Sequence, residues 1–262
     1  MRPPVLGVIP ARLSSTRLPR KPLHPIRGRP LLEWVWRRAS QMDLFDRLVV
    51  ATDAPEVVEL CRALGAPAVL TDPDHPSGTD RVAEVARRVE YRDLPVVVNV
   101  QGDEPLVRED HLAVAVELVR EGGWDVGTCA TPVITPEAFT DPSVVKVVMA
   151  PDGRALYFSR APIPWKRDGR PTKEELSATP FLRHVGIYAY RRDALMRWVA
   201  LPPSPLEEVE RLEQLRALEE GLRIGVALVE EARPGVDTEA DVARMEKMLM
   251  DPEPQTTPED PT

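Results

Sequence analysis

A basic segment follows the first apolar run of the chain. Val5–Ile9 leads into residues 10–23, which carry Arg12, Arg17 and Lys21 with hydroxyl side chains between them. Guanidinium and ammonium groups, together with successive backbone N–H groups, bind phosphate oxygens. The segment matches neither the P-loop nor the GxGxxG pattern, which disfavours ATPases and dinucleotide-binding proteins. It predicts a phosphate site, and a solvated basic loop is the alternative.

A carboxylate follows another apolar run. Val96–Val100 leads into Gln101, Gly102 and Asp103. Magnesium needs only one or two protein carboxylates when substrate phosphates complete its octahedron, and Gly102 leaves room for a ligand. Asp103 is therefore a candidate metal ligand, although a turn or helix-cap residue is the alternative.

A third polar segment, Ser77-Gly78-Thr79-Asp80-Arg81, follows a further apolar run. Its small and hydroxyl residues could contact a nucleobase or a ribose. The same residues are ordinary in turns and helix caps, so alone the segment does not decide between these roles.

Short β-branched runs alternate with helical patterns along the chain. Several runs are apolar throughout, as expected of strands covered on both faces. The alternation predicts an α/β fold with a mostly parallel central sheet flanked by helices. The expected strands are Val5–Ile9, Leu48–Thr52, Ala68–Thr71, Val96–Val100, Val126–Val133, Val144–Met149, His184–Tyr190 and Ile224–Val229. The expected helices are Leu31–Met42, Glu56–Leu64, Asp80–Val89, Glu109–Glu121, Leu206–Gly221 and Glu239–Met250.

Asp53, with Glu56 three residues later, is read as the cap of the helix Glu56–Leu64. In open α/β sheets, ligands bind just beyond the carboxyl ends of the strands. The basic segment and Asp103 both follow expected strands, so we expect them at that edge.

Two proline-rich stretches interrupt the alternation. Residues 162–180 hold four prolines and four basic residues, which predicts a long mobile loop that covers a site or contacts another subunit. Residues 251–262 hold four prolines, four acidic residues and no aliphatic side chain, which predicts a disordered tail. We therefore expect a single domain over residues 1–250, followed by this tail.

Composition sets the broad class. The chain has 262 residues, of which 43% are hydrophobic and 29% are charged, as in ordinary globular proteins. Cys61 and Cys129 are isolated thiols without zinc-site spacing, which indicates a reducing compartment. No signal-peptide core or long apolar run is present in the sequence, so we expect a soluble, cytoplasmic protein without membrane contact.

Charge is unevenly distributed. The net charge is -8, which argues against a generally basic nucleic-acid binder. Residues 1–38 nevertheless carry nine basic side chains and one acidic one, a local excess of +8. We interpret this excess as a compact site for a small polyanion.

Together, the quoted segments resemble the CMP-Kdo synthetase (3-deoxy-manno-octulosonate cytidylyltransferase) family. The resemblance continues through residues 156–165, 181–188, 204–207, 212–216 and 235–238, and extends from about residue 5 to 248. It implies a nucleotidyltransferase (GT-A-like Rossmann) fold with a protruding loop or small subdomain. It also implies that residues 157–222 carry sugar-binding and dimer-contact elements.

The resemblance implies a role for each matching residue. Lys21, Arg12, Asp103 and Asp237 would be catalytic, and Asp103 and Asp237 would bind Mg²⁺ as the cofactor. The residues that would bind CTP are Pro10, Ala11, Arg12, Lys21, Ser77, Gly78 and Gln101. Those that would bind the sugar acid are Arg17, Arg160, His184, Tyr188, Glu213 and Gln214. Without the resemblance, His184 reads as a strand-packing histidine and Glu213 as a solvated helix position.

The implied reaction is CMP transfer from CTP to the anomeric 2-hydroxyl of Kdo, for lipopolysaccharide biosynthesis. Charge accumulates on phosphate oxygens, so the protein must supply positive charge and alignment. No side chain stands out as a general base, and two metal ions could lower the pKa of the attacking hydroxyl. The partners implied are CTP, Kdo and a second copy of the chain.

The chain departs from the family pattern at Arg20, where glycine is usual, and at Leu13, which replaces an aromatic residue. Arg20 either adds affinity for the triphosphate or points to solvent. The stretch 166–180 also differs in length and composition.

Two other functions compete with this interpretation. One is a cytidylyltransferase for another 2-keto acid, such as a sialate or an amino analogue of Kdo. The other is a non-catalytic nucleotide or nucleic-acid binder, although residues 1–33 contain no aromatic side chain for base stacking.

Overall fold

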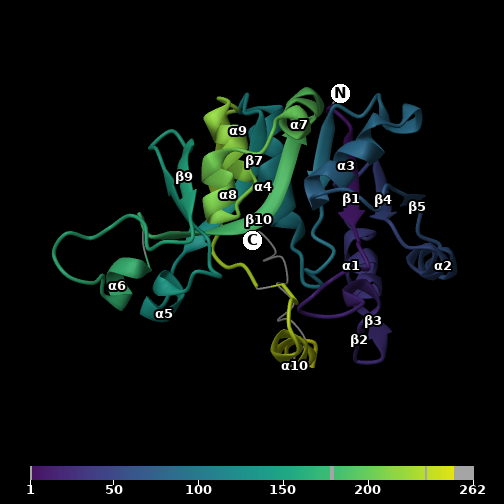
Figure 1. Cartoon of the computed structure of the whole chain (residues 1–262), viewed down its shortest axis with the longest axis horizontal. Coiled ribbons are helices and arrows are strands. Elements are labelled where there is room, and N and C mark those ends of the chain that lie inside the picture. Colours follow the sequence, from purple (N-terminus) through teal and green to yellow (C-terminus); the bar gives the residue numbers. More distant parts are fainter. Residues whose placement is uncertain (1, 178–179, 234, 251–262) are drawn as a thin grey trace, which may run out of the picture.

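The structure, a computed structural model, describes residues 2–177, 180–233 and 235–250. It is built on one large sheet, in which only β10 runs antiparallel to its neighbours along the main path (Figure 1). The expected mostly parallel sheet is confirmed, and the expected strands are present with ends shifted by one or two residues. In spatial order the strands are β11 (Ile224–Leu228), β7 (Val126–Pro132), β10 (Leu182–Arg191), β6 (Val96–Asn99), β1 (Val5–Pro10), β4 (Arg47–Thr52) and β5 (Ala68–Leu70).

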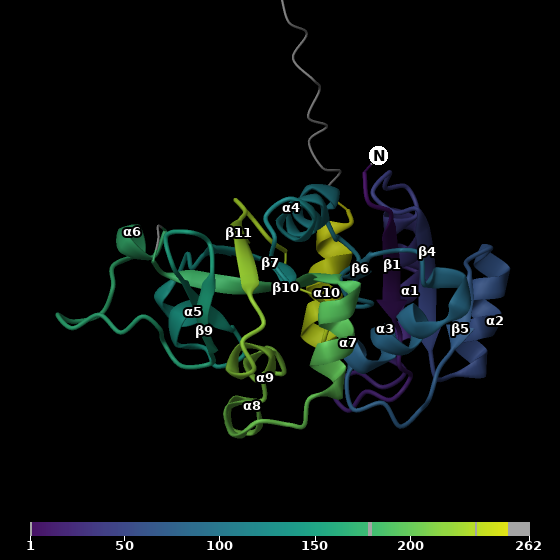
Figure 2. The same cartoon turned by 90° about the horizontal axis from the view of Figure 1, so that it is seen from above.

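Helices cover both faces of the sheet (Figure 2). Side chains alternate across a strand, so Val97 packs into one core cluster while Val96 and Val98 pack into the other. One cluster contains residues of α3 (Gly78–Arg87), α7 (Arg192–Ala200) and α9 (Gln214–Glu219). The other contains residues of α1 (Leu31–Ala39), α2 (Pro55–Leu64) and α4 (Glu109–Arg120).

A third, smaller cluster joins the two ends of the described chain. Leu18, Ile26 and Leu31 pack against Val236 and residues of α10 (Glu239–Met248). Ile26 belongs to a small hairpin made by β2 (Pro25–Ile26) and β3 (Arg29–Pro30). This cluster holds residues 235–248 beside the segment that follows β1.

The expected helix Leu206–Gly221 is wrong as a single element. It is divided into α8 (Pro205–Glu210) and α9, and Arg211 between them adopts a left-handed conformation with φ 54°. At the break, the Glu210 carboxylate accepts hydrogen bonds from Ser159 Oγ at 2.6 Å and from the Arg160 N–H at 2.9 Å. These contacts with a distant segment favour the break over continuation of the helix.

The expected Asp53 cap is also wrong. Helix α2 begins after Ala54, and no side chain caps it. Asp53 instead accepts a hydrogen bond from the Leu13 N–H at 3.2 Å and forms an ion pair with Arg81 at 3.1 Å. Its carboxylate therefore binds the segment after β1 rather than its own helix.

The stretch 162–180, predicted to be a long mobile loop, contains a short helix, α6 (Lys173–Leu176). Thr172 Oγ1 accepts from the Glu175 N–H at 3.3 Å, and Glu175 accepts from the Thr172 N–H at 2.8 Å, which is a capping box. Helix α6 lies away from the main sheet, near α5 (Pro136–Thr140) (Figure 1). Residues 178 and 179 and the predicted tail 251–262 lie outside the described residues.

The remaining elements complete the connections. Strands β8 (Lys146–Met149) and β9 (Ala155–Ser159) extend the sheet from β10. The short 3₁₀ helices are η1 (Lys21–Leu23) and η2 (Val89–Tyr91). Among the residues described, no helix has the length and apolar character needed to cross a membrane.

Candidate active site

A cavity of about 610 Å³ opens beyond the carboxyl ends of β1 and β6. Its lining includes the basic segment of residues 10–23, hereafter the basic loop, and both aspartates predicted to bind metal. The lining residues are Pro10, Ala11, Arg12, Ser14, Ser15, Thr16, Arg17, Lys21, Pro22, Gly78, Arg81, Gln101, Gly102, Asp103 and Asp237. Four segments that follow different strands therefore meet at one edge of the sheet, as open α/β folds predict.

Glycine at position 102 is required by close packing of two strand ends. A Cβ atom at Gly102 would overlap the carbonyl oxygen of Pro10. The absence of a side chain thus allows the basic loop to leave β1 directly against the start of the Asp103 turn.

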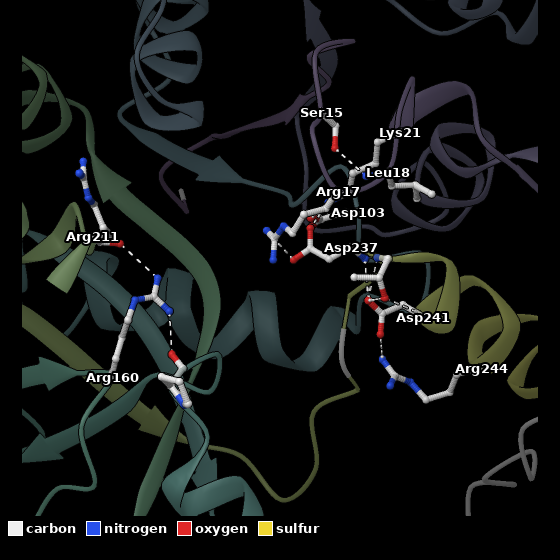
Figure 3. A network of polar contacts seen from close by, with 12 residues as sticks. Ser15, Arg17, Leu18, Lys21, Asp103, Arg160, Arg211, Asp237, Asp241 and Arg244 are labelled. Atoms are coloured by element: carbon white, nitrogen blue, oxygen red, sulfur yellow. Dashed lines mark hydrogen bonds and ion pairs between the residues drawn. The ribbon is translucent and has the colours of Figure 1, made fainter.

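Lys21 lies between the two predicted metal-binding aspartates (Figure 3). Its ammonium donates to Asp103 Oδ2, and to Asp237 Oδ1 at 2.6 Å. The guanidinium of Arg17 forms an ion pair with the other oxygen of Asp237 at 3.0 Å. Two cations of the basic loop are therefore held by carboxylates inside the cavity.

Burial lowers the pKa of Lys21, but the charges and hydrogen bonds of Asp103 and Asp237 outweigh that effect and raise its pKa above the ordinary value. Lys21 therefore carries its positive charge at neutral pH. An ammonium held in this way can exchange carboxylate oxygens for phosphate oxygens without a change of protonation.

Packing and one backbone hydrogen bond bring Asp237 to Asp103. The Val236 N–H donates to the Asp103 carbonyl oxygen at 2.9 Å, and the Val236 side chain is buried with Leu18. Directly after Asp237, Thr238 and Asp241 form the capping box of α10. The approach of the two aspartates thus depends on contacts between segments far apart in the sequence.

The donor set at Asp103 and Asp237 fits a magnesium ion. Both groups are hard oxygen donors, and both reach the same ammonium nitrogen, so one cation can contact the pair. Among the described residues, no group of three or more acidic, histidine or cysteine side chains could hold a metal. A metal at this pair would take its remaining ligands from phosphate oxygens and water.

Ser77 and Gly78 begin α3 at the cavity. Ser77 Oγ accepts from the Asp80 N–H at 3.2 Å and donates to the Asp80 carboxylate at 2.7 Å, so it caps the helix. Gly78, but not Ser77, lines the cavity. Gln101 also lines it and donates to the Gly186 carbonyl at 2.7 Å, which links the cavity to β10.

Arg160, a predicted sugar-acid ligand, is held by backbone carbonyls beside α8. Its guanidinium donates to the carbonyls of Glu210 at 2.7 Å, Pro142 at 2.9 Å and Arg211 at 3.3 Å, the last drawn in Figure 3. It does not line the cavity at the basic loop. A guanidinium has five N–H donors, so donors remain for an anion.

His184 and Tyr188 lie on β10 as neighbouring rings. Their centroids are 5.3 Å apart, and Phe158 packs against His184 at 5.0 Å. Thr128 Oγ1 donates to the Ile187 carbonyl at 2.6 Å, so it accepts from His184 Nε2 at 2.9 Å. Burial lowers the pKa of His184 to about 3. The ring is therefore neutral and carries its proton on Nε2.

Glu213 and Gln214 lie at the start of α9, next to α3. Thr79 donates to the Glu213 carboxylate at 2.7 Å. Burial raises the pKa of Glu213, while hydrogen bonds with Thr79 and Ser77 oppose the shift. Gln214 is buried. Of the predicted sugar-acid ligands, only Arg17 lines the cavity at the basic loop; the others surround β10 and α9.

Sequence reasoning did not assign a role to Arg81 or to Asp53 at the site. Arg81 is buried, lines the cavity, and donates to Thr71 Oγ1 and to Asp53. Asp53 in turn accepts from the Leu13 N–H of the basic loop. The quoted segment Ser77–Arg81 contained the signal, because an arginine three residues after the start of a helix can reach the adjoining strand end.

Comparison by sequence finds relatives along nearly the whole chain. A family profile described as "Cytidylyltransferase" matches residues 6–224. A 3-deoxy-manno-octulosonate cytidylyltransferase of Gemmatimonas aurantiaca is 54% identical over 92% of both chains. Proteins of the same name from Polynucleobacter asymbioticus and Acidobacterium capsulatum are 48% and 47% identical over 94% of this chain, and over 96% and 97% of their own lengths.

Comparison by structure agrees. A solved CMP:2-keto-3-deoxy-manno-octonic acid synthetase in complex with CTP superposes with a TM-score of 0.84 at 39% identity, covering 94% of this chain and 98% of the other. A 4-diphosphocytidyl-2C-methyl-D-erythritol synthase from Anaerococcus prevotii superposes with a TM-score of 0.63 at 14% identity, covering 95% and 96%, which shows a shared fold alone.

Proposed function

The chain belongs to the cytidylyltransferase family, and we propose that it transfers CMP from CTP to the anomeric 2-hydroxyl of Kdo. The products are CMP-Kdo and pyrophosphate. The observation that carries the proposal is the 54% identity to a 3-deoxy-manno-octulosonate cytidylyltransferase over 92% of both chains. The cation-lined cavity at the carboxyl ends of β1 and β6 supports it, because a triphosphate needs such a site.

In this reaction the sugar hydroxyl loses its proton to water, and its oxygen forms a bond to the α-phosphorus. The bond from that phosphorus to the oxygen bridging the β-phosphate breaks, and pyrophosphate leaves with that oxygen. Lys21 and Arg12 neutralise the charge that grows on the triphosphate oxygens. The ammonium of Lys21 exchanges Asp103 and Asp237 for phosphate as CTP enters. Pro10, Ala11, Ser77, Gly78 and Gln101 hold the nucleotide at the edge of the sheet.

Asp103 and Asp237 are the residues that would hold Mg²⁺. When bound, the metal would supply Lewis acidity at the phosphates and lower the pKa of the attacking hydroxyl. In the structure Lys21 pairs with both carboxylates and Arg17 with Asp237 alone, so the Lys21 ammonium holds the two aspartates together before substrate arrives.

The sugar acid would bind Arg17, Arg160, His184, Tyr188, Glu213 and Gln214. Arg160 can give its remaining N–H donors to the sugar carboxylate while its carbonyl contacts keep the guanidinium in place. Gln101 connects the two substrates, because it lines the nucleotide cavity and bonds to the backbone between His184 and Tyr188.

Pyrophosphate release tests the proposal. We expect turnover with CTP, Mg²⁺ and Kdo, and much less when a sialate or an amino analogue replaces Kdo, or when ATP, GTP or UTP replaces CTP. Preference for another 2-keto acid would make the chain a cytidylyltransferase of different specificity. Silence with every pair, together with salt-sensitive binding of RNA or DNA, would favour the non-catalytic binder.

We further propose that the chain forms a homodimer, acts in the cytoplasm and serves lipopolysaccharide synthesis. Two large apolar side chains between residues 157 and 222 support the dimer, since Trp165 is 79% and Val209 is 83% exposed. Light scattering should give twice the chain mass, and Trp165→Ser should shift it toward the monomer. An unchanged mass in that variant would exclude Trp165 from the contact.

A further inference from the structure

Arg20 adopts a backbone conformation that side chains disfavour. Its φ is 55° and its ψ is 35°, in the left-handed region where a Cβ crowds the neighbouring carbonyl. Glycine is the residue best suited to this conformation. Pro19 and Pro22 on either side have fixed φ angles. The change of backbone direction between them therefore depends on the φ angles of Arg20 and Lys21.

An ion pair with α2 holds the Arg20 side chain. Arg20 donates through one terminal nitrogen to Glu56 Oε1 at 3.1 Å and through the other to Glu56 Oε2 at 2.6 Å. Both side chains are exposed, and the guanidinium faces the carboxylate with two parallel bonds, which fixes orientation as well as distance. Arg20 itself does not line the cavity.

The turn at Arg20 directs Lys21 inward. The Arg20 carbonyl accepts from the Leu23 N–H at 2.8 Å, which closes the turn that begins η1. Arg20 therefore points outward to α2, while the next side chain, Lys21, points between Asp103 and Asp237 and is only 15% exposed. Strain at a special φ that adjoins a functional residue is a pointer to function.

We propose that Arg20 is a positioning residue for Lys21: its bidentate pair with Glu56 holds the left-handed turn that aims the Lys21 ammonium into the cavity. This inference rests on the proposed function, because Lys21 is assigned there to the triphosphate. The alternative is that Arg20 attracts the triphosphate directly, but Glu56 already neutralises the charge of Arg20.

The positioning role and the direct-attraction role predict opposite changes in the KM for CTP when Glu56 is replaced by glutamine. If Arg20 acted by charge alone, Glu56→Gln would remove a neighbouring negative charge and lower the KM for CTP. If Arg20 positions Lys21, the same variant releases the turn and raises that KM. We expect a rise of about two- to fivefold, the scale of an exposed ion pair, with the KM for Kdo unchanged.

Arg20→Ala should raise the KM for CTP to the same extent, because it removes the pair and keeps the disfavoured conformation. Arg20→Gly should leave the KM for CTP near the wild-type value, because glycine adopts the left-handed turn without the pair. Combining Arg20→Ala with Glu56→Gln should raise the KM for CTP no further, since both changes break one contact. The control is Glu59→Gln, which breaks the exposed pair between Glu59 and Arg62 on the same helix and should leave every constant unchanged.

Thermal unfolding distinguishes the effect of the left-handed turn on stability from the effect of the ion pair. Arg20→Gly relieves the left-handed conformation, so its Tm should exceed that of Arg20→Ala, which keeps the strain and also loses the pair. A lower KM for CTP in Glu56→Gln, or no change in it, would overturn the inference. Wild-type protein that releases no pyrophosphate from CTP and Kdo would overturn the proposed function instead.

Discussion

The two sides of the site hold their cations in different ways. In the basic loop, Lys21, Arg17 and Arg20 are held by side-chain carboxylates. In the region proposed to bind the sugar acid, Arg160 and the nearby Lys146 are held mainly by backbone carbonyls. A carboxylate competes directly with phosphate for a cation, whereas a backbone carbonyl is fixed by the fold. Phosphate can therefore replace the carboxylates around Lys21, whereas the fold fixes the carbonyl contacts of Arg160 and Lys146.

The two lysines make the contrast clearest. Lys146 is fully buried, and its ammonium donates to the carbonyls of Asp141 at 2.9 Å, Val144 at 2.5 Å and Arg160 at 2.6 Å. Burial lowers the pKa of Lys146, against the opposing charge of Asp141, while the two aspartates raise that of Lys21. Lys146 thus ties the turn at residues 141–144 to the segment that carries Arg160.

The largest effect should come from Asp103→Asn. The variant loses a carboxylate that pairs with Lys21 and that would hold the metal, so pyrophosphate release should fall below about a thousandth of the wild-type rate. Circular dichroism should show an intact fold. Near-normal turnover by this variant would contradict the proposed role of Asp103 as a metal ligand.

Replacing each lysine by methionine should produce crossed effects. Lys21→Met should reduce turnover by at least about a hundredfold while changing the free energy of unfolding by less than about 1 kcal/mol. Lys146→Met should lower that free energy by about 3 kcal/mol, because three carbonyls lose a donor. Urea unfolding and pyrophosphate release measure the two effects.

Equal losses of stability in these two variants would break the comparison. A stable Lys146→Met protein with a raised KM for Kdo would instead show that Lys146 acts on the sugar site through Arg160 rather than on the fold.

A smaller effect is the pH dependence of the free energy of unfolding that His184 produces. The pKa of His184 is about 3 in the folded chain and about 6.5 when unfolded, so the unfolded chain binds more protons between these values. The stability that the neutral ring contributes is present above about pH 6.5 and is lost as the pH falls toward 3. Because His184 is partly exposed, we expect a loss of about 2 kcal/mol rather than the full shift.

His184→Gln should flatten this pH dependence, since glutamine can still donate to Thr128 but does not take up a proton. Urea unfolding at several pH values measures it. A wild-type stability that does not change between pH 7 and 5 would contradict the lowered pKa of His184.

Much of the fold was predictable because its signals are local. The apolar runs Val5–Ile9 and Val96–Val100 became β1 and β6, and the basic loop and Asp103 follow them as expected. The helix over residues 206–221 was predicted wrongly because Arg211 has no local breaking signal. Its left-handed conformation accompanies contacts of Glu210 with Ser159 and Arg160, some fifty residues away.

The same limit applies to Arg20. Its type was visible as a departure from the family pattern, and two roles were left open. The structure shows a pair with Glu56, which neither role anticipated, because Glu56 is 36 residues away in the sequence, on α2.

By itself, the sequence determined which residue types follow which strands, and hence that cations and a carboxylate gather at one edge of the sheet. Local periodicity and the parallel order of the strands are enough for that. Only the tertiary structure decided that Asp237 meets Asp103 across one ammonium, and that Lys146 is bound by three carbonyls. These contacts depend on how the cluster of Leu18, Val236 and α10 packs, and on the paths of the connecting loops, which no local pattern encodes.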